Sequence, residues 1–164
     1  MKKFLSLCLV LMLCIAMAVP AFAAAGDTVS HMNVSVVVNE NEAVDVSGCV
    51  AGEEEKYVNL CDMARALNGT PAQFNVEWDG TVKIIKGQPY EAEAKVIPFG
   101  DEAVCVENHP IYVDGEAMEI AAFMLLDENG GGYTYVLGDD LKAAIGYEAV
   151  VDFESRTVTV TTEK

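Results

Sequence analysis

One stretch of the sequence decides the fold: "YVNLCDMARALNGTPAQFNVEWDGTVKII", residues 57–85. Its apolar residues first recur at the spacing of an amphipathic helix, at Leu60, Met63, Ala64 and Leu67. Asn59 can cap this helix because its side-chain oxygen can accept a hydrogen bond from the first turn, where Asp62 is also favourable. Asn68 and Gly69, followed by a proline, end it. The pattern therefore predicts a short helix that buries one face.

After this helix the apolar period changes to two. Apolar residues alternate with polar ones, turn at Asp79 and Gly80, and alternate again, at Phe74, Val76, Trp78, Val82 and Ile84. This pattern predicts a β-hairpin. Trp78 is the only tryptophan of the chain. It could serve as a platform that stacks against a sugar, but its place in the alternating series favours packing in the core.

A weaker copy of the same stretch returns as "YVLGDDLKAAIGYEAVVDFESRTVTV", residues 135–160. The best-matched positions are Tyr57 with Tyr135, Asp62 with Asp140, Leu67 with Ile145, and residues 74–79 with 147–152. Insertions fall in the turns and matches fall on expected core positions, as in a repeated structural unit. We therefore expect an internal repeat, with Asp139 and Asp140 in the first turn of a second helix.

The predicted fold is α+β, with two repeated strand–helix–β-hairpin units, each an antiparallel sheet with a short helix packed on one face. Further strands are expected at 34–38, 43–46, 103–106, 111–113, 123–125 and 133–137, with a loop over "CVAGEEEK" and order beginning near Asn33. The expected organisation is a signal peptide at 1–23, a loose leader at 24–33, a first unit at 34–86, a connector at 87–110 and a second unit at 111–164.

The N-terminal residues predict export. Lys2 and Lys3 precede an apolar run, and Ala21 and Ala23 occupy the small-residue positions of a signal peptidase site, which predicts cleavage after Ala23. A retained membrane anchor is the alternative, but the run is shorter than the roughly 20 residues that span a bilayer. Lipidation at Cys14 is disfavoured by the large residue before it. Cleavage would remove two lysines and no acid, so the formal net charge would fall from −16 to −18.

Charge and cysteine content narrow the classes of partner. Nucleic acid and anionic membranes bind cationic surfaces, so neither is expected as a partner of this acidic chain after signal cleavage. Cys49, Cys61 and Cys105 would remain, which permits at most one disulfide within the chain. The helical pattern favours a core thiol at Cys61, and a bond with Cys49 is the alternative. No CxxC pair is present, which excludes the usual zinc and thioredoxin-type sites.

No catalytic, cofactor-binding or metal-binding residue is assigned from the sequence. The chain has no GxSxG, HExxH, Walker or GxGxxG motif. Its two histidines, His31 and His109, fall in the expected leader and connector, and nucleophilic catalysis therefore has no credible base. "DENGGG", residues 127–132, lacks the spaced ligands of an EF-hand and is interpreted as a solvated turn, with weak Ca²⁺ binding left open.

The segments "YVNLCDMARAL", "FNVEWD" and "TVKI" resemble the copper amine oxidase N-terminal-like (stalk) domain family. The segments "KGQPYEAE" and "IYVDGEAMEI" are similar to secreted proteins of Gram-positive bacteria that carry two such units. The resemblance runs from about Val34 to Val160, and the second copy departs from it at Gly138 and Val151. It implies a stalk, rather than the part of such oxidases that holds the metal or the quinone. No amine oxidase activity is therefore expected.

Duplication without a catalytic constellation favours a secreted, non-catalytic, stalk-type module for cell-surface or cell-wall binding, scaffolding or adhesion. We expect an extracellular, cell-wall-associated protein whose partner is a wall polymer or a surface protein. Its oligomeric state is left open. The alternative is a small cell-wall hydrolase, or a hydrolase regulator, that acts through acidic side chains. Such an enzyme needs two carboxylates about 5–10 Å apart in a cleft.

Overall fold

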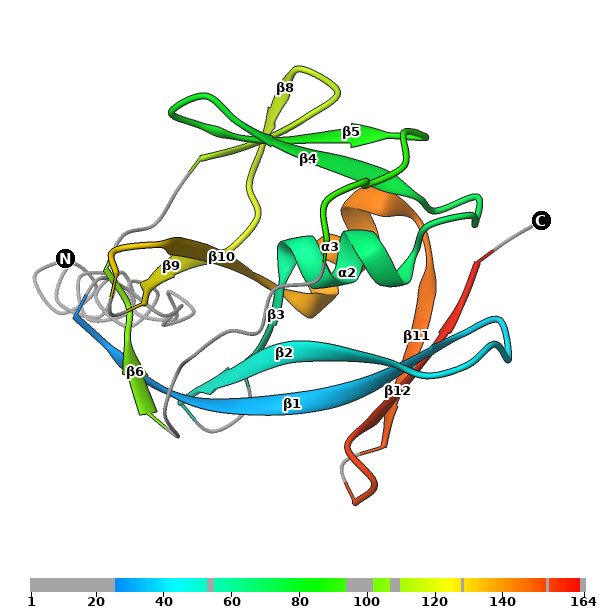
Figure 1. The fold of residues 1–164 in the computed structure, drawn as a ribbon, viewed down its shortest axis with the longest axis horizontal. Helices are drawn as coiled ribbons and strands as arrows, with labels where there is room; N and C mark the ends of the chain where they lie inside the picture. Colours follow the sequence, from blue (N-terminus) through cyan, green and yellow to red (C-terminus); the bar gives the residue numbers. More distant parts are fainter. Residues whose placement is uncertain are drawn as a thin grey trace, which may run out of the picture.

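The computed structural model describes residues 26–52, 55–93, 102–106, 110–127, 129–152 and 154–162 (Figure 1). The predicted signal peptide, residues 1–23, lies outside them, as does His109. In chain order the elements are β1 (Thr28–Val38), β2 (Val44–Ala51), β3 (Glu55–Asn59), α2 (Leu60–Ala66), β4 (Phe74–Trp78), β5 (Val82–Lys86), β6 (Glu102–Val104), β7 (Ile111–Val113), β8 (Glu116–Met118), β9 (Ala122–Leu126), β10 (Gly132–Leu137), α3 (Gly138–Ile145), β11 (Glu148–Asp152) and β12 (Thr157–Thr161).

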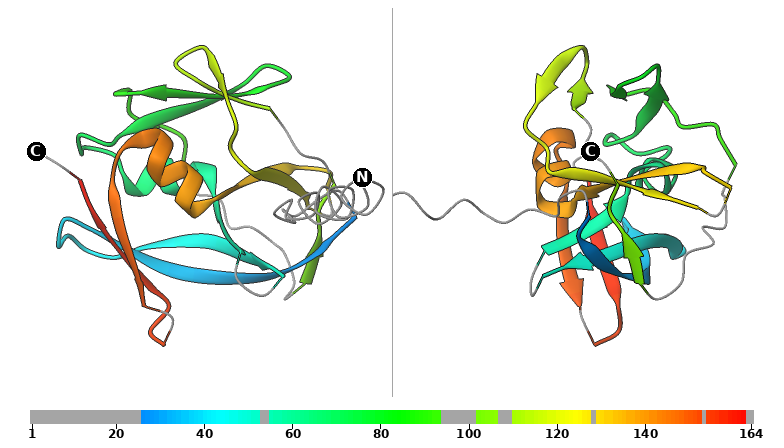
Figure 2. Two further views of the ribbon diagram at one scale, coloured as in Figure 1. Left: turned by 180° about the vertical axis from the view of Figure 1, so that it is seen from behind. Right: turned by 90° about the vertical axis from the view of Figure 1, so that its left-hand side faces the viewer.

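The predicted α+β fold of two repeated units is wrong. The described residues form mostly β structure, with two mixed sheets and two short helices. The larger sheet has the order β11-β12-β1-β2-β3-β10-β9, with β6 also paired to β1, and the smaller one has the order β4-β5-β7-β8. Both helices lie between the two sheets (Figures 1 and 2). The helices therefore share one layer instead of each covering a sheet of its own.

The pairing of strands explains why separate units do not form. β3 and β10, which precede the two helices, pair with each other, and this ladder is centred on the Val58–Val136 pair. The hairpin after α2 pairs with β7 through β5, whereas the hairpin after α3 pairs with β1 through β12. Strand, helix and hairpin do follow one another twice along the chain, but their partners come from the other half. The two halves are interlocked.

The larger sheet curls around a core of its own. Val106, after β6, donates its amide to the carbonyl of Met124 on β9, at 3.0 Å, which brings the two ends of the curl together. Tyr57 on β3 and Phe123 on β9 are separated in the sheet by β10, yet their ring centroids are 4.7 Å apart. Two rings from strands that are not neighbours in a sheet come this close when they lie on its concave face. The apolar residues inside the curl are Val29, Cys49, Ala51, Tyr57, Cys105, Phe123, Leu125 and Tyr135.

The outer face of the same sheet belongs to the main core. Successive side chains of a strand point to opposite faces, so Val136 faces the main core while its neighbour Tyr135 faces the inside of the curl. The main core joins this outer face to the helices and to the smaller sheet, through Leu60, Leu67, Leu141, Phe74, Ile84 and Ile111. Each side chain in that list is at most 1% exposed.

The helix and the hairpin predicted for the opening stretch are confirmed. α2 begins at Leu60, and the side chain of its N-cap residue Asn59 accepts a hydrogen bond from the amide of Asp62 at 3.0 Å. The four predicted stripe residues are all buried. β4 and β5 form the predicted hairpin around Asp79 and Gly80, and Gly80 has a φ of 101°, which a glycine adopts without strain.

Two predictions near the N-terminal part of the described chain are wrong. Order was expected from Asn33, but β1 begins at Thr28, because Val29 is fully buried inside the curl and β6 pairs with residues 28–30. The loop expected over "CVAGEEEK" is largely strand, because β2 continues to Ala51 and β3 begins at Glu55. Both extensions complete the wall of the curl.

An aspartate fastens the first turn of each helix to a neighbouring backbone. Asp62 of α2 accepts a hydrogen bond from the amide of Ser47 on β2 at 3.0 Å. Asp140, the matched residue of α3, accepts one from the amide of Ala121 at 2.8 Å. Both residues are helix-start charges, as predicted. Each carboxylate also has a second role, because it accepts a hydrogen bond from a backbone amide outside its helix.

Candidate functional site

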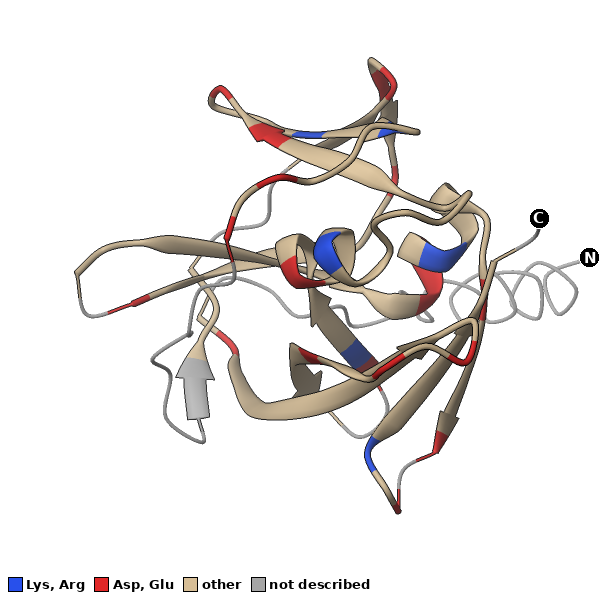
Figure 3. Ribbon diagram, turned by 45° about the vertical axis from the view of Figure 1, so that its right-hand side comes forward, with Lys and Arg blue, Asp and Glu red and all other residues tan. Residues whose placement is uncertain are grey.

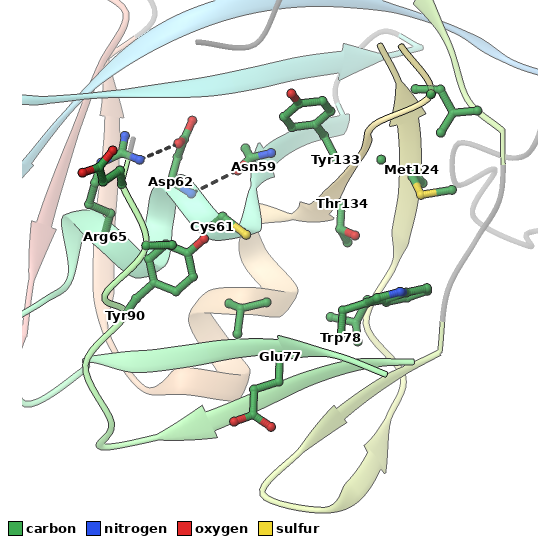
Figure 4. Close-up of a pocket in the computed structure, with 17 residues that line it drawn as sticks. Asn59, Cys61, Asp62, Arg65, Glu77, Trp78, Tyr90, Met124, Tyr133 and Thr134 are labelled. Atoms are coloured by element: carbon green, nitrogen blue, oxygen red, sulfur yellow. Dashed lines mark hydrogen bonds and ion pairs between the residues drawn. The ribbon is translucent and has the colours of Figure 1, made fainter. Parts of the chain in front are cut away.

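A cavity of about 420 Å³ lies between the hairpin β4–β5, the hairpin β9–β10 and the first turn of α2 (Figure 4). We call it the aromatic groove because Trp78, Tyr90 and Tyr133 line it. Polar groups come from Asn59, Asp62 and Thr134. Its volume falls within the range of about 300–1,000 Å³ that is usual for small-molecule sites.

Trp78 is 58% exposed, so the prediction that it packs in the core is wrong. Burial falls along β4, from fully buried Phe74 through half-buried Val76 to Trp78. α2 has seven residues and is therefore only about 10 Å long, whereas the five residues of β4 extend over about 17 Å. The helix covers the start of the strand, and Trp78 projects beyond it to form a wall of the groove.

The other two aromatic side chains are held in place by their surroundings. The side chain of Asn68 binds both backbone groups of Tyr90, accepting from its amide at 2.8 Å and donating to its carbonyl at 2.7 Å. Tyr133 donates its hydroxyl to Asp127 at 3.2 Å. Burial, with a smaller contribution from Cys61, raises the pKa of Tyr90, and burial followed by Asp127 raises that of Tyr133. Both phenols remain protonated donors at neutral pH.

The carboxylates of the groove are poorly placed for acid–base chemistry. Asp62 already accepts hydrogen bonds from the amide of Ser47 and, at 2.9 Å, from the guanidinium of Arg65. The side chain of Glu77 leaves β4 on the side away from Tyr90 and Cys61 (Figure 4). Glu93 is exposed at the edge of the groove. Of the three carboxylates that line the groove, Asp62 is committed to the fold and Glu77 is directed elsewhere.

A polar chain of half-buried His31 with buried Ser47 and Tyr135 joins three strands inside the curl, and the sequence did not indicate it. His31 Nε2 lies 2.7 Å from the hydroxyl of Ser47, which in turn lies 2.7 Å from the hydroxyl of Tyr135. The expectation that His31 belongs to a loose leader is wrong. A histidine beside a serine hydroxyl is one of the pairings that nucleophilic catalysis uses. However, Ser47 is only 5% exposed and lines neither of the two cavities described for this protein.

The three cysteines of the described residues are thiols, with no disulfide among them. Cys49 and Cys105 lie inside the curl, where burial raises their pKa values to about 12 and about 11. Cys61 is half-buried and lines the aromatic groove, so the predicted core thiol is only partly enclosed. The alternative bond between Cys49 and Cys61 is absent because the two residues lie in different parts of the fold.

Two acidic segments considered in the sequence take structural roles. Asp127 accepts hydrogen bonds from the amides of Asn129 and Gly131, at 2.8 and 2.7 Å, so its carboxylate organises the turn that follows. Asp139 pairs with Lys142 at 3.1 Å on the surface of α3. Within the described ranges, His, Cys, Asp and Glu side chains nowhere gather in the groups of three or more that could hold a metal ion.

Comparison with known proteins adds no relative. No protein-family model, no curated protein and no solved structure matches this chain. The resemblance to the copper amine oxidase N-terminal-like (stalk) domain therefore stays a prediction. In the part of the chain that the structure describes, no helix is long and apolar enough to cross a membrane.

Proposed function

We propose that this protein is a non-catalytic, secreted module that binds neutral glycan of the cell surface in the aromatic groove. The observation that carries the proposal is the exposure of Trp78 on a wall of that groove. An exposed indole face costs free energy in water unless a ligand covers it, and the apolar face of a sugar ring is a matching surface. Secretion rests on the signal-like N-terminal residues of the sequence.

The polar groups of the groove suit hydroxyl groups. Tyr133, Asn59 and Thr134 combine donors and acceptors beside apolar surface from Met124 and Leu126. A few placed polar groups in a mainly apolar lining are typical of sites that fix one orientation of a ligand. A sugar ring has this same division, because its faces carry C–H groups and its edge carries hydroxyls.

Charge selects among glycans. Asp62 of the groove is paired with Arg65 at 2.9 Å, Glu93 is exposed at its edge, and the whole chain carries a formal net charge of −16. An anionic polymer would be repelled by this field at low ionic strength. We therefore expect binding to neutral oligosaccharides, and weak or no binding to uronic-acid or phosphate-bearing polymers.

Because Trp78 is the only tryptophan, its fluorescence reports directly on the groove. Titration with soluble oligomers of N-acetylglucosamine should change its emission saturably. Sedimentation with insoluble chitin, a neutral polymer of the same sugar, should rank the variants in the same order of affinity. Trp78→Ala should abolish sedimentation and Trp78→Phe should weaken it. The matched control is Val150→Ala, which removes a 72%-exposed apolar side chain from β11, outside the groove.

Three results would contradict the proposal. They are no saturable binding of any neutral glycan, unchanged sedimentation of Trp78→Ala, and tighter binding to anionic polymers than to neutral ones. The hydrolase alternative is measured in the same samples as release of new reducing ends. Release of reducing ends by the parent protein, and its loss in Glu93→Gln, would show that the protein is a hydrolase and not a binding module.

A further inference from the structure

A second cavity, of about 450 Å³, enters the main core from the surface. Its floor is the outer face of three neighbouring strands, with Val34 and Val36 on β1, Gly48 on β2 and Val58 on β3. α3 and the hairpin β11–β12 form its walls, through residues such as Tyr147 and Ala149. The cavity is apolar in its depth because these valines also border the main core.

The mouth of this cavity gathers the scarce positive charge of the protein. Six lysine and arginine residues occur in the described ranges, and three of them line this cavity, Lys56, Lys142 and Arg156. Acidic residues are spread over the loops, strands and helices of the rest of the fold (Figure 3). A chain with a formal net charge of −16 therefore carries a local excess of cations over the two acids of this cavity, Asp139 and Asp152.

Both acids of the mouth are engaged nearby. Asp139 pairs with Lys142 at 3.1 Å. Asp152 accepts hydrogen bonds from the backbone amides of Glu154 and Ser155, at 3.0 and 3.4 Å, within its own turn. Lys56 comes from β3 and Arg156 from the turn between β11 and β12, so the cations that line the cavity come from different elements.

The backbone of Arg156 suggests a role for its side chain. Its φ is +54°, in the left-handed region that glycine and asparagine adopt most readily. Its carbonyl accepts a hydrogen bond from the amide of Ser35 at 3.0 Å, which ties the turn to β1. Glycine would serve this backbone better, so the turn itself does not explain an arginine. A positive charge beside the cavity is the role we assign to it.

We propose that this cavity binds a single-chain fatty acid, with the hydrocarbon chain over the valine floor and the carboxylate at the mouth near Arg156. The combination of an apolar interior and a cationic mouth matches a ligand with one apolar chain and one anionic head. The cavity is distinct from the aromatic groove, so the inference stands apart from the glycan-binding proposal.

A peptide is a poorer occupant of this cavity. β1, β2 and β3 are interior strands of the larger sheet, so their backbone groups are already paired with one another and with their other neighbours. A peptide lying over their faces would bury its own amides without partners, at a cost for each group. A hydrocarbon chain has no such groups to satisfy.

The test is calorimetric titration of the purified protein with octanoate, decanoate and dodecanoate. Binding should be one to one and should tighten by about fourfold for each added methylene group, as expected for burial of the chain. The methyl ester of dodecanoate, which lacks the charge, should bind at least about tenfold more weakly than the acid. High salt should weaken the acid more than the ester.

Three variants locate the ligand. Ala149→Phe places a ring in the cavity and should abolish binding. Arg156→Asn removes the charge and introduces a residue that tolerates the left-handed backbone. It should weaken the binding of dodecanoate by about tenfold and leave the binding of the ester unchanged. Lys83→Gln removes a cation of β5 that lines neither cavity and is the matched control, with no change expected.

Several outcomes would overturn the proposal. They are no saturable binding of any of the three acids, equal affinity for acid and ester, or full binding by Ala149→Phe. Should Ala149→Phe fail to fold, as judged by circular dichroism, Arg156→Asn alone decides, and unchanged affinity there refutes the site. Loss of binding on Trp78→Ala, with no effect of Arg156→Asn, would place the acid in the aromatic groove and also refute it.

Discussion

The hydroxyl groups of Ser47 and Tyr135 are hydrogen-bonded at 2.7 Å between β2 and β10, inside the curl of the larger sheet. His31 on β1 binds the same serine oxygen at 2.7 Å. Three strands are therefore joined through one hydroxyl in an apolar interior, where each polar group needs a partner. The amide of the same serine binds Asp62, so Ser47 also connects the curl to the first turn of α2.

Removal of this hydroxyl chain should lower stability in a non-additive way. Tyr135→Phe keeps the ring stacked on Phe123, at a centroid distance of 5.6 Å, and should lower the free energy of unfolding by about 1 kcal/mol. Ser47→Ala removes the oxygen that both partners bind and should cost about 2–3 kcal/mol. The double variant should lose less stability than the sum of the two single-variant losses, because Tyr135→Phe has already broken one of the two hydrogen bonds of the Ser47 hydroxyl.

Chemical denaturation of the four proteins of this double-mutant cycle measures the coupling. Tyr112→Phe, at a half-buried tyrosine of β7 in the other sheet, is the control and should change stability by less than about 0.5 kcal/mol. Strict additivity of Ser47→Ala and Tyr135→Phe would show that the two hydroxyls do not interact in solution.

Phe74 and Trp78 share one face of β4 but should differ sharply in what they contribute. Phe74 is fully buried, so Phe74→Ala should cost about 3–5 kcal/mol through lost contacts and a cavity. Trp78, which is 58% exposed, can be replaced by Thr at a cost below about 1 kcal/mol. Thermal unfolding of both variants checks this. A large loss of stability in Trp78→Thr would mean that the side chain of Trp78 packs in the core in solution.

The contrast between these two residues shows what the sequence could predict. Alternation identifies the face of a strand, and Phe74 lies where alternation places it. How far along β4 that face is covered depends on the length and the position of α2. The alternation of apolar and polar residues carries no information about either. The exposed indole, and with it the groove, therefore appears only in the folded chain.

Local causes were predicted well and long-range pairing was not. The cap at Asn59 and the hairpin turn at Gly80 depend on neighbouring residues, so the sequence could predict them. The parallel pairing of residues 35–38 with residues 157–160 joins opposite ends of the described chain. Many β-branched segments of this sequence could serve as either partner. This ambiguity led to the wrong picture of two separate units, and it also hid β1 before Asn33 and the place of His31.

The cap of α2 offers a test of local stability. The side chain of Asn59 accepts the amide of Asp62, so Asn59→Ala should lower the free energy of unfolding by about 1 kcal/mol. Asn59→Ser can make the same bond without burying a charge at this 2%-exposed position and should restore much of the loss. Hydrogen exchange at the amide of Asp62 should quicken in Asn59→Ala only. Equal stability of the alanine and serine variants would mean that the cap contributes nothing.

The cysteines should react with an alkylating agent in a fixed order. Cys61 is half-buried at the groove, whereas Cys49 and Cys105 are each 1% exposed and have raised pKa values that suppress the reactive thiolate. At pH 8 under native conditions, peptide mapping should find label on Cys61 long before the other two. In denaturant all three should react at similar rates. Early labelling of Cys49 in the native protein would mean that the curl opens readily.

Stability should fall at alkaline pH because the folded state holds protons that the unfolded state loses. Burial, and then the nearby Cys105, raise the pKa of Cys49 from 9.0 to about 12. Between these values the unfolded chain binds fewer protons than the folded one. The free energy of unfolding should therefore decrease by about 1.4 kcal/mol per pH unit for this group, from about pH 9 to pH 12. Below pH 9 its contribution is fully present.

Two variants separate this titration from simple loss of packing. Cys49→Ala should be less stable at pH 7, yet its stability should decline less steeply above pH 9, and Cys105, with a pKa raised to about 11, should account for part of the remaining slope. Val29→Ala creates a defect in the same core without removing an ionisable group, so its slope should equal that of the parent protein. Denaturant unfolding measured at intervals from pH 7 to pH 12 gives both slopes. Identical slopes for Cys49→Ala and the parent would show that the thiol inside the curl is not what makes the fold sensitive to base.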